Sequence, residues 1–292
     1  MNLVFHYGAL GDFVLLLPIL RGLAGPTTLV TAWPRAVLAS RMVPGITPMD
    51  IQLWEFMRLH TEGGPTSVSP AIGELFEKAT ELISLVSNGR DAWAENVARL
   101  APQANRVFVE PRPSDSYQGH LTEWLAGQIR QQGLAIEPVI EGEPTTDPAG
   151  PIAIHPGSGG EHKCWPADRY EAVIQSVLQA GYPVRVLLGE TEIDRWPADR
   201  LEHWQTGYGA EVFETLDQLY EALSNCRAYL GNDSGPTHLA AQMGLPTLAL
   251  FGPTDPTLWA PVGRNVKVLS PPSPTDMSWL EVQTVIDAMP LD

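Results

Sequence analysis

One stretch, residues 228–263, constrains the fold of this chain more than any other. It reads AYLGNDSGPTHLAAQMGLPTLALFGPTDPTLWAPVG. Two short apolar runs, residues 228–230 and 246–251, flank a polar turn and a helical pattern. Apolar residues recur at helical spacing after the turn, and Gly244 is placed to end the helix. The pattern therefore predicts a strand, a turn, a helix, a strand and a second turn.

The turn at residues 231–236 is a candidate anion site. A Gly- and Ser-rich turn that opens a helix presents N–H groups without intrahelical partners, and the helix dipole favours negative charge there. The alternative is an ordinary strand–helix turn, because such turns commonly contain Gly, Asp and Ser. Spacing alone does not decide between the two.

The composition limits the class of protein. A length of 292 residues with 44% hydrophobic residues fits two domains with sizeable cores. The formal charge of −16 argues against a nucleic-acid partner and leaves at most peripheral contact with an anionic membrane. The two cysteines, Cys164 and Cys226, form no CxxC motif, which indicates a reducing compartment.

The apolar run near the start, residues 13–23, needs separate consideration. A secretory signal has a positively charged segment before its apolar core, whereas Asp12 precedes this one. The run is also shorter than the roughly 20 residues that cross a bilayer. We expect a soluble, cytoplasmic protein.

The first half opens as an α/β domain. An apolar strand at residues 3–5 leads into a G-x-x-G-D turn, a helix apolar on all sides from residue 13 to 20, and a strand at 28–33. The turn is not the G-x-G-x-x-G of dinucleotide-binding proteins. Asp12 follows the carboxyl end of the first strand, where open α/β sheets bind ligands. Alternatively, its carboxylate only stabilises the helix N-terminus.

Further strands and helices alternate along the first half, although residues 46–68 read as irregular. The expected elements are helices at residues 34–43, 73–79, 92–100 and 120–134, and strands at 81–86 and 107–109. Residues 137–150 have the composition of a linker. We place domain boundaries at residues 1–145 and 146–292, and consider that the last helix packs back on the first domain.

The second half repeats the α/β alternation. Strands are expected at residues 152–154 and 184–188, with a helix after Pro166 that ends near Gly181. Thr215 and Gln218 have the spacing of a capping box, and so do Ser278 and Glu281 before the last helix. The predicted fold class is α/β, with two doubly wound, Rossmann-like domains facing a central cleft.

A Gly- and Ser-rich loop at residues 156–160 follows the strand at 152–154. Its backbone N–H groups are suited to a phosphate, because no bulky side chain obstructs them. Lys163 lies directly after this loop in a chain with only 18 Lys and Arg residues. It is a candidate partner for a phosphate oxygen, the alternative being a solvated lysine before a helix.

These motifs resemble glycosyltransferase family 9, the ADP-heptose:lipopolysaccharide heptosyltransferases. The segments concerned are GALGDFVLLLPIL, HPGSGGEHKCWPADRYEAVIQ and GNDSGPTHLAAQMGLPTLALFGPTDP, in that order along the chain. The resemblance covers residues 3–23 and about 150–263, and is weaker at 81–134. It implies a GT-B fold and an inverting, metal-independent enzyme that uses no cofactor and takes a nucleotide-sugar donor and a saccharide or glycolipid acceptor.

The resemblance also implies roles for individual residues. Asp12 matches the catalytic carboxylate, the general base that removes the proton of the acceptor hydroxyl. Lys163 matches the lysine that binds the donor diphosphate, and Glu192 is the candidate that holds the donor ribose. The remaining donor-binding residues implied by the match lie in the two glycine-containing loops: Ser158, Gly159, Asp233, Ser234, Gly235, Thr237 and His238.

We therefore expect a glycosyltransferase that moves a sugar, heptose in the family it resembles, from an ADP-sugar to a saccharide such as lipopolysaccharide core. Two other functions stay open. One is a non-catalytic family member that binds a nucleotide or glycan, suggested by the short first half. The other is a sugar-nucleotide epimerase of similar fold.

Overall fold

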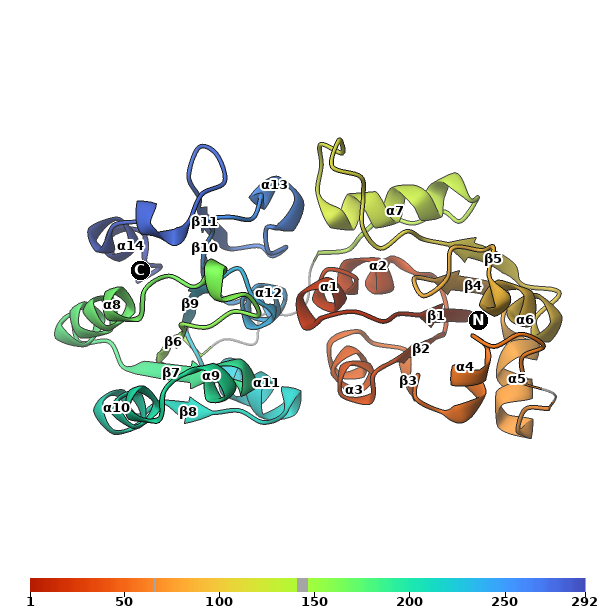
Figure 1. Ribbon diagram of the computed structural model, residues 1–292, viewed down its shortest axis with the longest axis horizontal. Coiled ribbons are helices and arrows are strands. Elements are labelled where there is room, and N and C mark those ends of the chain that lie inside the picture. Colours follow the sequence, from red (N-terminus) through yellow and green to blue (C-terminus); the bar gives the residue numbers. More distant parts are fainter. Residues whose placement is uncertain (66, 141–146, 292) are drawn as a thin grey trace. The chain divides into compact units, whose positions relative to one another are not determined.

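The computed structural model describes residues 1–65, 67–140 and 147–291, and it contains two compact units. Unit 1 comprises Met1–Ala9 and Leu16–Val139, and unit 2 comprises Leu10–Leu15 and Ile140–Asp292. Each unit holds one sheet with helices packed against it (Figure 1). The boundary predicted between residues 145 and 146 lies outside the described residues.

Unit 1 is built on a five-stranded parallel sheet in the order β3-β2-β1-β4-β5. The alternation of strands and helices follows the apolar pattern of the sequence. Its elements are β1 (Asn2–Phe5), α2 (Leu17–Gly22), β2 (Thr27–Thr31), α3 (Trp33–Met42), β3 (Ile46–Asp50), α4 (Trp54–Arg58), α5 (Pro70–Lys78), β4 (Glu81–Ser84), α6 (Ala92–Leu100), β5 (Asn105–Phe108) and α7 (Leu121–Gln131).

Phe5, in the central strand of this sheet, organises the core of unit 1. Its ring lies edge-on to Phe56 of α4 and Trp93 of α6, with centroids 5.5 and 5.0 Å away. Side chains alternate across a strand, so Leu3 shares this face with Phe5. Both are fully buried, as a strand inside a parallel sheet requires.

Unit 2 holds a six-stranded parallel sheet in the order β11-β10-β9-β6-β7-β8. Counted from its own first strand this order is 6-5-4-1-2-3, the doubly wound order of Rossmann-like domains. Its elements are α1 (Leu10–Val14), β6 (Ile152–His155), the 3-10 turn η1 (Glu161–Lys163), α8 (Ala167–Gln179), β7 (Val184–Leu188), α9 (Glu190–Arg195), α10 (Ala198–Tyr208), β8 (Glu211–Val212), α11 (Leu216–Ser224), β9 (Ala228–Asn232), α12 (Gly235–Gln242), β10 (Thr247–Leu250), α13 (Pro256–Trp259), β11 (Val266–Leu269), η2 (Met277–Trp279) and α14 (Val282–Ala288).

Trp165 anchors the loop after β6 in the core of unit 2. Its ring is 1% exposed and lies 5.1 Å from the ring of Tyr170 in α8. The indole N–H donates to the carbonyl of Leu280, 3.0 Å away, so the buried polar atom is satisfied. Helix α14 packs beside α8 and adds Val285 to the same core.

The predicted α/β class, with two doubly wound sheets, is confirmed. Several elements agree closely with their predicted bounds, including α6 (Ala92–Leu100) and β7 (Val184–Leu188). The capping box of Thr215 is also present: its hydroxyl accepts from the Gln218 N–H, and the Gln218 side chain accepts from the Thr215 N–H. Among the described residues, no helix is long and apolar enough to cross a membrane.

The helix predicted from residue 13 to 20 is wrong as one element. The structure contains α1, which belongs to unit 2, and α2, which belongs to unit 1. Pro18 explains the break: it lacks an N–H and is suited only to the first turn of a helix, where it lies in α2.

Two further predictions need correction. Residues 46–68 are not simply irregular, because β3 and α4 lie within them. Pro48 obscures β3 in the sequence, yet β3 is an edge strand, where a missing ladder N–H is tolerated. The last helix begins at Val282, and Ser278 lies in η2, so the predicted capping box of Ser278 and Glu281 does not form at its start.

The turn after α8 provides a test of backbone strain. Gly181 has φ +86°, and a Cβ at this residue would have no neighbour within 4 Å, so Gly181→Ala meets only the conformational penalty. We expect it to lower the free energy of unfolding by about 1 kcal/mol. Gly207→Ala, inside α10, is the control and should raise it by up to about 1 kcal/mol. Urea denaturation measures the free energy of unfolding of both variants. Equal effects would contradict the left-handed backbone conformation of Gly181.

Candidate functional site

The candidate site lies where three neighbouring strands of unit 2 end. The loops after β6, β9 and β10 leave the carboxyl edge of the sheet side by side. Between β6 and β9 the strand order reverses, and α/β sheets bind ligands at such a switch point. Topology therefore brings the glycine loop at 156–160 beside the turn that follows β9.

Asp233, directly after β9, joins all three loops. One carboxylate oxygen lies 2.8 Å from Lys163 Nζ and accepts the hydroxyl of Thr254 at 2.8 Å. The other lies 3.5 Å from Nε2 of His238. The Ser158 hydroxyl donates to the Asp233 carbonyl at 2.7 Å. The site thus depends on one side chain that is only 6% exposed.

The surroundings of Asp233 change its pKa. Burial raises it, but the hydrogen bonds and charges of His238 and Lys163 outweigh burial and lower the pKa from 3.8 to about 2. The carboxylate is therefore ionised at neutral pH. As an anion it holds the Lys163 ammonium. An ammonium group has three N–H donors, and this bond uses one of them.

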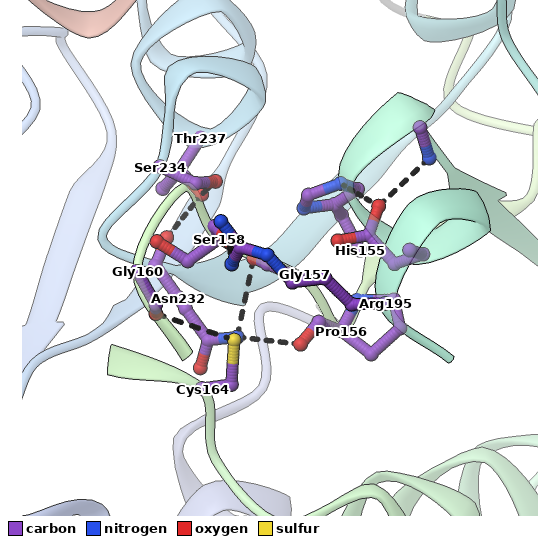
Figure 2. Close-up of polar contacts among 12 residues, drawn as sticks. His155, Pro156, Gly157, Ser158, Gly160, Cys164, Arg195, Asn232, Ser234 and Thr237 are labelled. Atoms are coloured by element: carbon purple, nitrogen blue, oxygen red, sulfur yellow. Dashed lines mark hydrogen bonds and ion pairs between the residues drawn. The ribbon is translucent and has the colours of Figure 1, made fainter. Parts of the chain in front are cut away.

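Asn232, the last residue of β9, fixes the glycine loop (Figure 2). Its amide nitrogen donates to the carbonyls of Pro156 and Gly157 at 2.7 and 3.3 Å. Its amide oxygen accepts the N–H of Trp165 at 3.0 Å. The side chain is fully buried, so it serves the shape of the loop and not direct contact with a ligand.

The start of α12 is held by a network of hydroxyl groups. Thr237 Oγ1 lies 3.0 Å from Ser234 Oγ and 3.1 Å from the Tyr229 hydroxyl, and it donates to the carbonyl of Asn232. Both Ser234 and Thr237 are buried. These two predicted donor-binding side chains therefore shape the turn, leaving the N–H groups at the start of α12 as its polar surface.

Glu192, at the start of α9, lies beneath the glycine loop. Its Oε2 accepts the Gly189 N–H at 2.8 Å and lies 3.5 Å from His155 Nε2. Burial raises the pKa of Glu192, but His155 and the backbone N–H groups outweigh it and lower the pKa below its usual value. A Cβ at Gly157 would come 1.7 Å from Glu192 Oε1. A larger residue at this point of the loop would displace the Glu192 carboxylate from Gly189 and His155.

Further loop contacts come from two side chains that the sequence analysis did not assign to the site. Arg195 of α9 donates to the carbonyls of Ser158 and Gly159 at 3.3 and 2.8 Å, leaving the tip at Gly159 exposed. The Cys164 thiol donates to the carbonyl of Gly160, and burial raises its pKa to about 11. This thiol is protonated at neutral pH and supports the loop without acting as a nucleophile.

Asp12 lies on α1, which packs against α12 within unit 2. A Cβ at Gly11 would lie 3.4 Å from the His238 ring, and one at Gly235 would lie 2.8 Å from the Leu10 side chain. The half-buried Asp12 therefore lies on a helix in contact with the Asp233 site. Among the described residues, no group of three or more His, Cys, Asp or Glu is arranged to hold a metal ion.

The chain belongs to glycosyltransferase family 9. The model of this family, described as glycosyltransferase family 9 (heptosyltransferase), matches residues 132–282, which is more than half of the chain. The matched part includes Lys163 and Asp233, whereas Asp12 precedes it.

A sequence relative and two solved structures resemble the chain. Lipopolysaccharide heptosyltransferase 3 of Escherichia coli K12 is 28% identical over 120 residues, 39% of this chain and 34% of the relative, so the match spans about a third of that protein. E. coli heptosyltransferase WaaC with ADP has a TM-score of 0.70 at 19% identity over 98% of both chains. E. coli ADP-heptose lps heptosyltransferase II has a TM-score of 0.67 at 16% sequence identity, and the match covers 98% of this chain and 96% of that structure. These structures confirm the GT-B fold.

The Asp233 cluster predicts a pH dependence of stability. The pKa of Asp233 is lower in the folded chain, so its stabilisation is present above pH 4 and is lost as the pH falls towards 2. Asp233→Asn should lower the free energy of unfolding at pH 7 by about 2 kcal/mol. The variant should also lose less of its free energy of unfolding than the wild type as the pH falls below 4. Urea denaturation at several pH values measures this, with Glu202→Gln, an exposed carboxylate, as control. An unchanged pH profile would contradict it.

The two glycines of the loop give a matched pair for packing. Gly157→Ala places a methyl group against the Glu192 carboxylate, whereas Gly159→Ala meets nothing within 4 Å. We expect the first to lower the free energy of unfolding by about 1–3 kcal/mol and the second to leave it within about 0.5 kcal/mol. Calorimetric melting of both variants tests this. If they melt alike, Glu192 does not pack tightly on the loop.

Proposed function

We propose that this chain is an inverting, metal-independent glycosyltransferase that moves heptose from an ADP-sugar to a saccharide acceptor such as lipopolysaccharide core. Membership of family 9 and the name of the E. coli relative support the sugar and the acceptor. The solved structure of WaaC with ADP supports the nucleotide. We place the reaction in the cytoplasm, with at most peripheral membrane contact, in keeping with a net charge of −16.

The observation that carries this proposal is the Lys163–Asp233 ion pair at the start of α12. The pair, 2.8 Å long, holds an ammonium group between the glycine loop and the first N–H groups of the helix. Such a place suits a diphosphate, because its charge meets a fixed cation and oriented N–H donors. His238 adds support: its buried Nδ1 has no hydrogen-bond partner within the described part of the chain, so a donor oxygen is a suitable partner.

In the proposed reaction, Asp12 accepts the proton of the acceptor hydroxyl. The resulting oxygen forms a bond to the anomeric carbon on the face opposite the diphosphate, and the bond from that carbon to the diphosphate oxygen breaks. One such displacement inverts the configuration and releases ADP. Negative charge grows on the leaving diphosphate, and Lys163 with the backbone N–H groups compensates it. The family resemblance assigns Glu192 to the ribose side of the donor. Because its side chain is only 2% exposed, we propose that it acts there by holding the Gly189 turn.

The test of this mechanism separates chemistry from binding. Asp12→Asn removes the base but leaves the Asp233 site, so we expect ADP binding within about twofold of the wild type and a transfer rate lower by at least about a hundredfold. Calorimetry with ADP and release of ADP from ADP-heptose in the presence of lipopolysaccharide core measure the two. Transfer at the normal rate would reject Asp12 as the base.

Lys163→Ala is the complementary variant. It should raise the KM for ADP-heptose and also lower kcat, because leaving-group charge is largest in the transition state. Lys267→Ala, at an exposed position of β11, controls for the loss of one positive charge. Tight ADP binding without transfer by the wild type would indicate a non-catalytic member, whereas conversion of the ADP-sugar without release of ADP would indicate an epimerase.

A further inference from the structure

Unit 1 carries a set of exposed aromatic side chains that the proposed chemistry does not use. Tyr7, Trp33 and Trp54 are 72%, 51% and 53% exposed. Most large apolar side chains of this unit are buried. A single exposed ring is ordinary on a protein surface, whereas several gathered in one place mark a candidate binding surface.

These three residues occupy equivalent places in the fold. Tyr7 follows β1 by two residues, Trp33 follows β2 by two, and Trp54 follows β3 by four. The strands are neighbours in the sheet, with Phe5 opposite Val30 and Thr31 opposite Asp50. Three adjacent parallel strands thus each deliver an exposed ring at the carboxyl edge, which is the ligand-binding edge of an α/β sheet.

The hydrogen bonds at this edge hold the strand ends in place. The N–H of His6 donates to the Val30 carbonyl, and the N–H of Ile51 donates to the Thr31 carbonyl, at 3.0 and 2.9 Å. Trp33 and Trp54 are then the first residues of α3 and α4. Their backbones are fixed by regular structure, so binding a ligand on these rings costs little ordering.

The charges near these rings do not select a polyanionic surface. The segments that carry the two tryptophans, residues 33–42 and 50–58, contain three bases, Arg35, Arg41 and Arg58, and two acids, Asp50 and Glu55, an excess of only one positive charge. A membrane of anionic lipids requires a clear excess of basic residues. A saccharide instead presents flat C–H faces and hydroxyl groups, which suit the apolar face and polar edge of Trp and Tyr.

We infer that Tyr7, Trp33 and Trp54 form an aromatic platform on which sugar rings of the acceptor stack. This rests on the proposed function and adds the residues that select the acceptor. Tyr7 supports the link, because it lies in the short segment between β1 and α1, five residues before the proposed base. Such a platform would bind the acceptor through the faces of its sugar rings, and this mode of binding requires no net positive charge on the protein.

The test uses the full chain and lipopolysaccharide core oligosaccharide from which the acyl chains have been removed. Trp33→Ala and Trp54→Ala should each weaken binding of this oligosaccharide about tenfold in calorimetry and raise its KM by a similar factor. Binding of ADP should not change. Trp33→Phe, which keeps a flat ring, should restore most of the loss, and Leu178→Ala, 50% exposed in α8, is the surface control.

The outcomes separate this inference from the proposed function. If the wild type transfers heptose but the alanine variants bind and use the oligosaccharide normally, the platform is wrong and the proposed function stands. If the wild type binds the oligosaccharide through these residues without transfer, the platform stands and the enzymatic proposal fails. Failure of the wild type to bind it overturns the platform. The platform is also overturned if the alanine variants lose only binding to phosphatidylglycerol vesicles, or if their only effect is dissociation of a dimer.

Discussion

The buried carboxylate of Asp233 is the interaction on which the second unit's candidate site depends. An ionised group that is almost fully buried is stable only when cations and hydrogen-bond donors surround it. Lys163, His238 and Thr254 supply these groups from three separate segments of the chain. The loop after β6, the start of α12 and the loop after β10 are therefore fixed relative to one another by one side chain, before any ligand is considered.

Several side chains next to Asp233 fix the shape of the site and leave ligand binding to the backbone N–H groups and Lys163. Asn232 and Arg195 donate to backbone carbonyls of the glycine loop, and Glu192 accepts the Gly189 N–H in the turn after β7. The loop itself contributes mainly N–H groups. This arrangement suits a ligand whose charge is spread over several oxygens, because preorganised donors need not reorient when charge develops.

Much of the fold could be predicted because it follows local rules. Apolar runs indicated β6 and β7, helical spacing indicated α8, and a glycine at left-handed φ marked its end. Strand β3 was missed because it contains Pro48. A proline argues against a strand unless that strand lies at the edge of a sheet. The order of strands in a sheet depends on tertiary structure and cannot be inferred from the local sequence. Pairing of Lys163 with Asp233 was within reach once both loops were placed on adjacent strands. The roles of Thr254 and Arg195 were not. Thr254 lies within the segment that resembles the family, but nothing in the sequence pairs its hydroxyl with Asp233, and Arg195 lies outside every such segment.

The excursion of residues Leu10–Leu15 limits how the molecule can be divided. The backbone leaves unit 1 after Ala9, places α1 on α12, and returns at Leu16. A single cut between Val139 and Ile140 would therefore not yield two self-contained halves. The first fragment would carry a helical turn that completes the second, and the second alone would expose the apolar surface of α12. The two pieces are predisposed to fragment complementation, with α1 as the element that reunites them.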